Sequence, residues 1–243
     1  KTHFFFEGSG ACVFNAGSST IQTRIGVRIN GSSFTFNAGT SSIYVSEGND
    51  FKGSGNTFYD VYLDANTNIN IEGENTFNIL SIGAGTNVNI TSGDTITTSQ
   101  LIASGTKNAP ITINGLTLGS QAGISQASGT VNGDFLILQD LVGTGGATFN
   151  ANNSIDNGNN LGWNFTGYTP LNYYWVGSTG NWSDTLHWAT ASGGGTVHST
   201  LPGLEDNVFF DANSGASASI VTLDISDPIC GNVDFTGVAA NFN

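Results

Sequence analysis

Three tryptophans close together in the sequence, Trp175, Trp182 and Trp188, are the residues best suited to hold a ligand. The face of an indole ring packs well against the C–H face of a sugar, and amide groups beside it can bind sugar hydroxyls. These residues are therefore a weak candidate for a glycan-binding site. The alternative, which we favour, is that they cover the apolar core at an open end of the fold, as terminal units of repeat proteins must.

Paired carboxylates would be the signature of a glycan-cleaving enzyme, because such enzymes place two acids on either side of the scissile bond. Neighbouring acids occur at three places that read as turns or strand edges, where solvated carboxylates are ordinary. None of them has a supporting His or Arg nearby in the sequence, so we expect no catalytic site. The pairs are Asp60 with Asp64, Glu72 with Glu74, and Glu205 with Asp206.

The sequence offers little to a metal ion. His187 and His198 are too irregularly spaced for a helical metal site, and Cys12 and Cys230 lie near opposite ends of the chain without metal-ligand spacing. No D-x-[DN]-x-[DN]-G calcium loop occurs. We therefore expect no cofactor, with a calcium ion held by carboxylates as the alternative. The sequence leaves open whether the two cysteines pair.

The composition excludes several classes of partner. Charged residues make up only 9% of the chain, and 18 acids against 5 bases give a net charge of −13. Such a chain repels nucleic acid and lacks the polybasic segment that an anionic membrane surface attracts. No apolar run approaches the roughly 20 residues of a membrane-spanning helix. We expect neither nucleic-acid binding nor membrane insertion.

An internal repeat gives the clearest statement about the fold. The segment 55–71 aligns without a gap with the segment 74–90, so that Asn56 matches Asn75 and Ile71 matches Ile90. Both segments end in alternating apolar and polar residues, the pattern of half-buried strands. Short strands separated by Gly and Asn turns, at a period near 20, are typical of a β-solenoid.

We therefore predict an all-β fold, a right-handed parallel β-helix with coils of about 19–22 residues. Alternate residues of each coil should point into the tube and stack on their equivalents one coil away. The expected inward residues are Ile69, Ile71, Val88 and Ile90, and the expected outward residues are Asn68, Asn70, Asn87 and Asn89.

A shift in composition near residues 167–171 predicts two parts. Residues 1–168 should form the solenoid coils, although residues 1–50 match the repeat poorly. Residues 169–243 should form a Trp-rich β module that begins the next repeat, with new strands in 221–224 and 233–237. Both ends of the chain suggest a piece cut from a longer repetitive polypeptide.

Three segments carry a family resemblance. Residues 105–113 resemble the G-T-x-x-x-P-I-T-[IF] coil of extracellular β-helix proteins, and residues 157–165 resemble the D-x-G-N-N-x-G-W-x-F ending of such repeats. Residues 174–194 are similar to a W-x-G-G-x-G-x-W-S-D opening followed by Trp and S-G-G, with Ser178 in place of the second Gly. The chain thus resembles tandem-repeat surface proteins of Bacteroidetes-type bacteria, including gliding adhesins, and related phage fibre proteins.

The resemblance implies a structural and adhesive repeat segment of a large secreted protein, located on a bacterial cell surface or a phage virion. Its partners would be neighbouring repeats of the same polypeptide, surface glycans, or a cell-envelope or virion assembly. Thr95 and Thr185, each between Asp and an aliphatic residue, resemble O-glycosylation acceptors of these bacteria. The alternative function is a tailspike-like polysaccharide-degrading β-helix enzyme, which rests on fold analogy alone.

Overall fold

The computed structural model describes residues 4–7, 11–30, 34–216 and 218–238. The chain divides into two compact units, Lys1–Tyr168 and Thr169–Asn243. Its regular structure is almost entirely β-strand, and within the described ranges the only helix is the short 3₁₀ turn η1 (Thr185–His187). No helix among the described residues is both long and apolar enough to cross a membrane. The two terminal residues Lys1 and Asn243 lie outside the described ranges.

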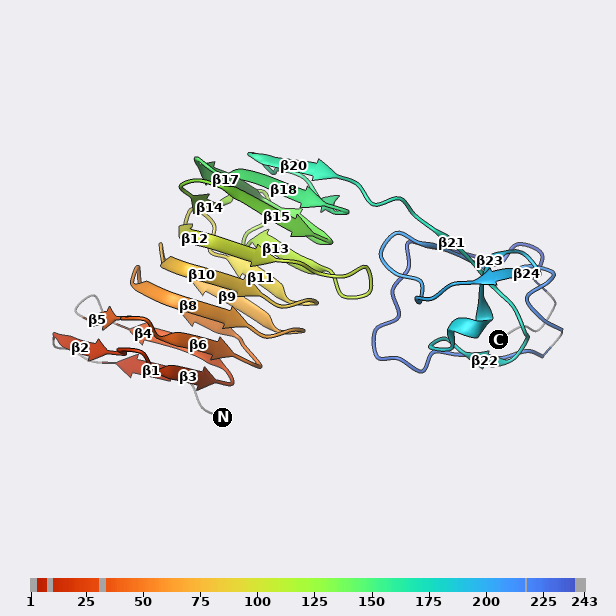
Figure 1. Ribbon diagram of the computed structural model, residues 1–243, viewed down its shortest axis with the longest axis horizontal. Coiled ribbons are helices and arrows are strands. Elements are labelled where there is room, and N and C mark those ends of the chain that lie inside the picture. The colour runs from red at the N-terminus through yellow and green to blue at the C-terminus, as the bar shows by residue number, and fades with distance from the viewer. Residues whose placement is uncertain (1–3, 8–10, 31–33, 217, 239–243) are drawn as a thin grey trace. The chain divides into compact units, whose positions relative to one another are not determined.

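The first unit is a parallel β-solenoid, which confirms the predicted fold class. Successive passes of the chain add one strand to each sheet, so that the strands stack in layers (Figure 1). An eight-stranded sheet contains β1 (Phe4–Glu7), β4 (Gly26–Asn30), β7 (Asp50–Lys52), β9 (Asn68–Glu72), β11 (Asn87–Ile90), β13 (Ile111–Gly115), β16 (Leu136–Gln139) and β19 (Ile155–Asp156).

A seven-stranded sheet forms the second wall of the solenoid. It contains β3 (Thr20–Thr23), β6 (Ser42–Val45), β8 (Thr57–Leu63), β10 (Thr76–Ile82), β12 (Thr95–Ala103), β14 (Ala122–Gln126) and β17 (Leu141–Gly145). Two smaller parallel sheets complete the coils, one of β2 (Cys12–Asn15) and β5 (Phe34–Asn37), the other of β15 (Thr130–Asp134), β18 (Thr148–Asn152) and β20 (Trp163–Thr166). The described residues before Phe51 thus form coils like the rest, although their sequence matches the repeat poorly.

The coil length varies more than the sequence repeat suggested. Asn89 donates a hydrogen bond to Asn70, 19 residues earlier, as the repeat predicts. In a later coil the N–H of Thr117 donates to Ser92 Oγ, 25 residues earlier. The predicted range of coil lengths was therefore too narrow. The extra residues lie in a loop between strands, at 104–110, where they do not disturb the parallel ladder.

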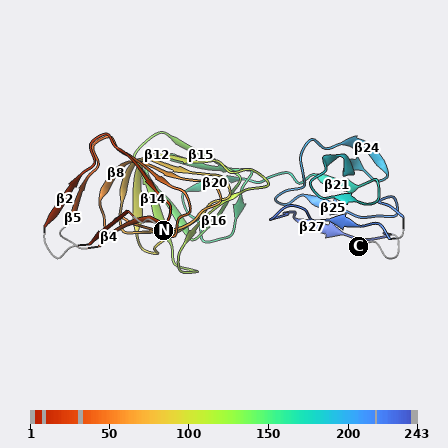
Figure 2. The ribbon, with the colours of Figure 1, turned by 90° about the horizontal axis from the view of Figure 1, so that it is seen from below.

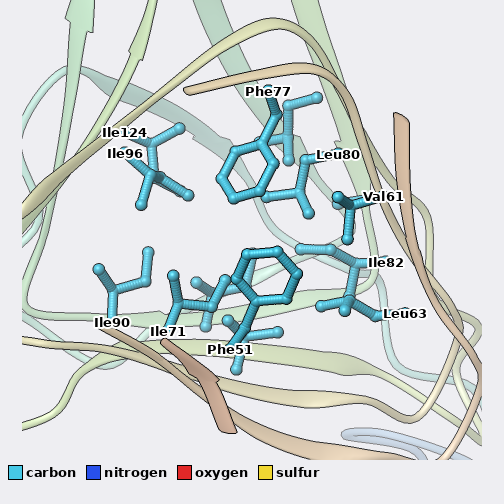
Figure 3. Packing of buried hydrophobic residues seen from close by; sticks show 14 of the residues in the cluster. Phe51, Val61, Leu63, Ile71, Phe77, Leu80, Ile82, Ile90, Ile96 and Ile124 are labelled. Atoms are coloured by element: carbon cyan, nitrogen blue, oxygen red, sulfur yellow. The ribbon is translucent and has the colours of Figure 1, made fainter. Parts of the chain in front are cut away.

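The core is a set of apolar columns running through the stacked coils. Ile69, Ile71, Val88 and Ile90 are each at most 1% exposed, which confirms their predicted inward position. Val88 lies in register with Ile69, and Ile90 with Ile71. Figure 3 shows Ile71 and Ile90 among the other side chains that fill the interior. Burying one such side chain contributes about 1.5–3 kcal/mol, so every coil depends on its neighbours for stability.

A buried amide closes the turn before β10. Asn75 is fully buried, and its Oδ1 accepts a hydrogen bond from the backbone N–H of Gly55 at 3.1 Å. Its Nδ2 donates to the carbonyl of Glu72 at 2.9 Å. Only a glycine fits at position 53, since a Cβ there would lie 2.1 Å from the Asn75 Oδ1. Asn56, one coil earlier, donates and accepts in the same way, with Gly53 and Phe36.

The second unit is built from shorter strands in two sheets. The larger sheet has the order β24-β23-β21-β25-β27, in which β23 runs antiparallel to both of its neighbours, β21 and β24. The strands β21, β25 and β27 run parallel and lie side by side (Figure 2). The strands are β21 (Asn172–Trp175), β22 (Gly180–Asn181), β23 (Trp188–Ala191), β24 (Gly194–Val197), β25 (Asn207–Phe209), β26 (Val221–Thr222) and β27 (Asn232–Asp234), with β22 and β26 pairing separately.

Replacing the buried amide tests how strongly the turn depends on it. We expect Asn75→Ala to lower the free energy of unfolding by about 2–4 kcal/mol, because it leaves the Gly55 N–H and the Glu72 carbonyl without their partner. The control is Asn89→Ala, which removes a half-buried amide that donates outside the core to Asn70. It should cost less than about 1 kcal/mol. Urea denaturation followed by circular dichroism measures both, and equal losses would contradict the assignment.

Candidate functional site

The tryptophan cluster belongs to the core of the second unit. Trp175 and Trp188 are 0% exposed and Trp182 is 5% exposed. Trp188 packs edge-on against Trp175 at 4.9 Å and against Trp182 at 4.7 Å between ring centroids. Trp188 Nε1 donates to the carbonyl of Trp182, and Trp175 Nε1 donates to the carbonyl of Ser178. The rings of Trp175 and Trp188 are fully covered by protein, and Trp182, which borders an apolar cavity, is almost completely buried, so these residues present no open platform for stacking on a sugar.

The histidines also serve the packing of this unit. His187 stacks on Trp175 with ring centroids 4.5 Å apart, and its Nδ1 hydrogen-bonds to the carbonyl of Val176. His198 stacks on Tyr173 at 3.8 Å. Each imidazole thus covers a different aromatic ring. Among the described residues no three His, Cys, Asp or Glu side chains come together as a metal site would require.

The acidic residues that are paired in the sequence make separate structural contacts. Asp206 is fully buried and accepts hydrogen bonds from the backbone N–H groups of Leu171 and Gly203, each at 2.9 Å. Asp60 accepts from Asn78 Nδ2 at 2.9 Å, and Glu72 pairs with Lys52 at 2.5 Å. Asp64 lines a shallow cavity with Arg24 and Tyr44, and its sequence neighbour Asp60 is not part of that lining.

The two threonines in the glycosylation-like tripeptides occupy different settings. Thr95 begins β12 and is half-buried, with its side chain against the backbone of Gly123 on β14. Thr185 is half-buried in η1, immediately after Asp184, whose carboxylate accepts from the N–H of Leu186 at 2.9 Å. Both assignments stay predictions.

The cysteines are free thiols in different environments. Cys12 on β2 is exposed, whereas Cys230 is half-buried in the second unit. Cys230 lines an apolar cavity of about 330 Å³ together with Trp182, Phe210 and Phe235. Burial in this cavity, and secondarily the charge of Asp206, raises the pKa of the Cys230 thiol.

The same unit has an open parallel edge. Among the described strands, β27 has a partner on one side only, β25. A row of amides crosses the three parallel strands, since Asn207 donates to Asn172 and Asn232 donates to Asn207, each at 3.0 Å. Phe235 stacks on Phe210 at 5.0 Å and remains 57% exposed. A further strand could therefore pair with β27, extend the amide row from Asn232 and cover Phe235.

The outer faces of the solenoid carry similar rows of uncharged polar groups. Asn89 donates to Asn70 at 3.1 Å across neighbouring coils. On the three-stranded sheet, Asn150 donates to Asn132 at 2.9 Å and Asn164 donates to Asn150 at 3.2 Å. The equivalent residues of successive coils thus present amides in register, bonded to one another along the stack.

A row of hydroxyls on the seven-stranded sheet was missed by the sequence reasoning. We call it the hydroxyl row, and parallel pairing places its five members in register, one on each of five successive strands. Its first and last steps span 19 residues, as the sequence repeat does, but the two steps between them span 21 and 28 residues, so loop insertions hid the row as a whole. The members are Thr57, Thr76, Thr97, Ser125 and Thr144.

Tryptophan fluorescence checks the burial of the aromatic cluster. All four tryptophans are at most 9% exposed, so acrylamide should quench the folded protein weakly and the urea-unfolded protein several-fold more strongly. Addition of a neutral hexasaccharide such as cellohexaose should leave the emission maximum unchanged, because the tryptophan side chains are buried. Strong quenching of the folded protein would contradict the assignment of these residues to the core.

The thiols should differ in reactivity for a related reason. At pH 8 iodoacetamide should modify Cys12 several-fold faster than Cys230, because the nucleophile is the thiolate and the pKa of Cys230 is raised in a half-buried site. The rate at Cys230 should keep rising as the pH increases above 9. Peptide mapping by mass spectrometry follows both sites, and in urea the two rates should converge. Equal rates in the folded protein would disprove the assignment.

Comparison with known proteins yields no match to a protein-family model, to a curated protein or to a solved structure. The function must therefore be argued from the geometry of the two units.

Proposed function

We propose that this chain is a structural and adhesive segment of a large surface or fibre protein, which extends and attaches rather than catalyses. The observation that carries the proposal is the combination of a buried apolar interior with rows of uncharged polar groups in register on the outside of the stacked coils. Such a surface repeats the same contact group at every coil. Attachment through many weak, equivalent contacts suits an adhesive surface.

The solenoid also suits extension. Each added coil lengthens the stack by about 4.8 Å, the spacing of neighbouring strands. Because each coil buries its apolar residues on the coils beside it, further repeats continue the same core without a new fold. Neighbouring repeats of the same polypeptide are therefore the first partners that we propose.

The open edge of the second unit supports this partner. A further parallel coil with an outward Asn and an inward apolar residue would continue the amide row from Asn232 and cover Phe235. It would also close the apolar cavity beside Cys230. We place the protein outside the cell, on a bacterial surface or a virion, on the strength of the resemblance of residues 105–113, 157–165 and 174–194 to repeats of that kind.

An adhesion assay tests the proposal. Beads coated with the protein are passed under flow over surfaces of cellulose, xylan, laminarin and a bacterial cell-envelope preparation. We expect retention on at least one surface well above that of albumin-coated beads, with no release of sugar reducing ends. Reducing ends released in proportion to time would favour the enzyme instead. Retention no greater than that of albumin on every surface would overturn the adhesive function.

A further inference from the structure

A shallow groove runs over the seven-stranded sheet of the solenoid beside the hydroxyl row. Its volume is about 520 Å³, within the range of sites that bind small molecules. One side is formed by the end of β5 and the turn after it, and the floor by the first halves of β8 and β10. The polar residues that line it are Asn37, Thr57, Tyr59, Thr76, Asn78 and Ser99.

The groups in this groove are available to a ligand. Within the described part of the chain, the hydroxyls of Thr57, Thr76 and Ser99 form no hydrogen bond to another protein group. Inward-facing hydroxyls of the same solenoid differ, since those of Thr67 and Thr86 both donate to the carbonyl of Asp64. The hydroxyls of Thr67 and Thr86 are thus used in hydrogen bonds within the fold, whereas the hydroxyls of the groove face solvent.

The amides keep acceptor capacity in the same way. Asn37 uses its Nδ2 to donate to Asn15 at 2.7 Å, and Asn78 uses its Nδ2 to donate to Asp60 at 2.9 Å. These bonds fix the direction of each side chain and leave its Oδ1 as an acceptor. The groove therefore presents fixed acceptors next to rotatable hydroxyls, which can either donate or accept.

The lining also limits the class of ligand. No Lys, Arg, His, Asp or Glu lines the groove in the described chain, so a charged ligand would lose its hydration without gaining an ion pair. Tyr59 is 36% exposed, whereas Phe36, Phe58 and Phe77 are buried beneath the groove as part of the core. An exposed aromatic ring beside hydroxyls and amides suits the apolar face and the hydroxyl rim of a pyranose.

From these observations we propose that the groove binds a neutral oligosaccharide that lies along the stack of coils. The proposal rests on the adhesive function above and names its ligand class and site. Successive members of the hydroxyl row are about 4.8 Å apart, close to the length of one sugar in an extended chain. One sugar would thus meet one coil, and the members Thr97, Ser125 and Thr144 would continue the contact beyond the groove.

The test measures binding of three neutral hexasaccharides, cellohexaose, xylohexaose and laminarihexaose, by isothermal titration calorimetry, with hexagalacturonate as the charged counterpart. At least one neutral probe should bind. The double variant Thr57→Val and Thr76→Val should weaken it about 4- to 100-fold, because each of the two lost hydrogen bonds costs about 2- to 10-fold. Tyr59→Ala should weaken it about 5- to 10-fold by removing the stacking ring.

The matched control is Thr130→Val, which removes an exposed hydroxyl from β15, a strand that does not line the groove. Thr57 and Tyr59 are exposed and Thr76 is half-buried, so thermal melts should show all variants folded. Equal affinity of the groove variants and the control would overturn the site. Failure of all three neutral probes, or tighter binding of hexagalacturonate, would overturn the ligand class. Either result leaves the adhesive function standing if beads coated with the double variant are still retained.

Discussion

Parallel register between successive coils is the constraint on which the rest of the structure depends. Each strand of the solenoid pairs with the equivalent strand one coil away, so a residue shares its direction with the residues above and below it in the stack. An inward position must then be apolar in every coil, which produces the buried columns through Ile69 and Val88 and through Phe36, Phe58 and Phe77. Asn75 can enter the interior because its amide bonds to backbone groups on either side.

The same register organises the outer faces. Outward residues also stack, and uncharged amides can tolerate this because each can donate to the next, as Asn89 does to Asn70. Rows of like charge would repel at this spacing, whereas rows of amide and hydroxyl groups do not. The low content of charged residues can therefore be explained by the stacking of the coils alone, without a ligand. The hydroxyls of the groove differ from the amide rows because they are not bonded to one another, and that difference makes them the candidates for binding.

The second unit uses its aromatic and ionisable groups for packing. Its strands are short, and the unit compensates with large side chains, Trp175, Trp188 and Tyr173, that are fully buried. Asp206 supports three separate segments from the interior by accepting from Leu171 and Gly203 and, through its carbonyl, from Gly231. The Trp, His and Asp side chains that the sequence offers as candidates for binding or catalysis thus stabilise the small core of this unit. Part of its exposed apolar surface lies at the edge strand β27 and around Phe235.

The sequence by itself determined the fold class, because a gapless repeat with alternating apolar residues can bury its inward side chains only by stacking coils in parallel. It also determined which residues of that repeat face inward, since the period of a strand is two. The tertiary structure decided what depends on pairing between distant segments. It showed that the tryptophans pack on one another, that coils of unequal length stack in one register, and that five hydroxyls fall into one row. Loops of unequal length hide such a row from the sequence, because register is set by hydrogen bonds between strands and not by spacing along the chain.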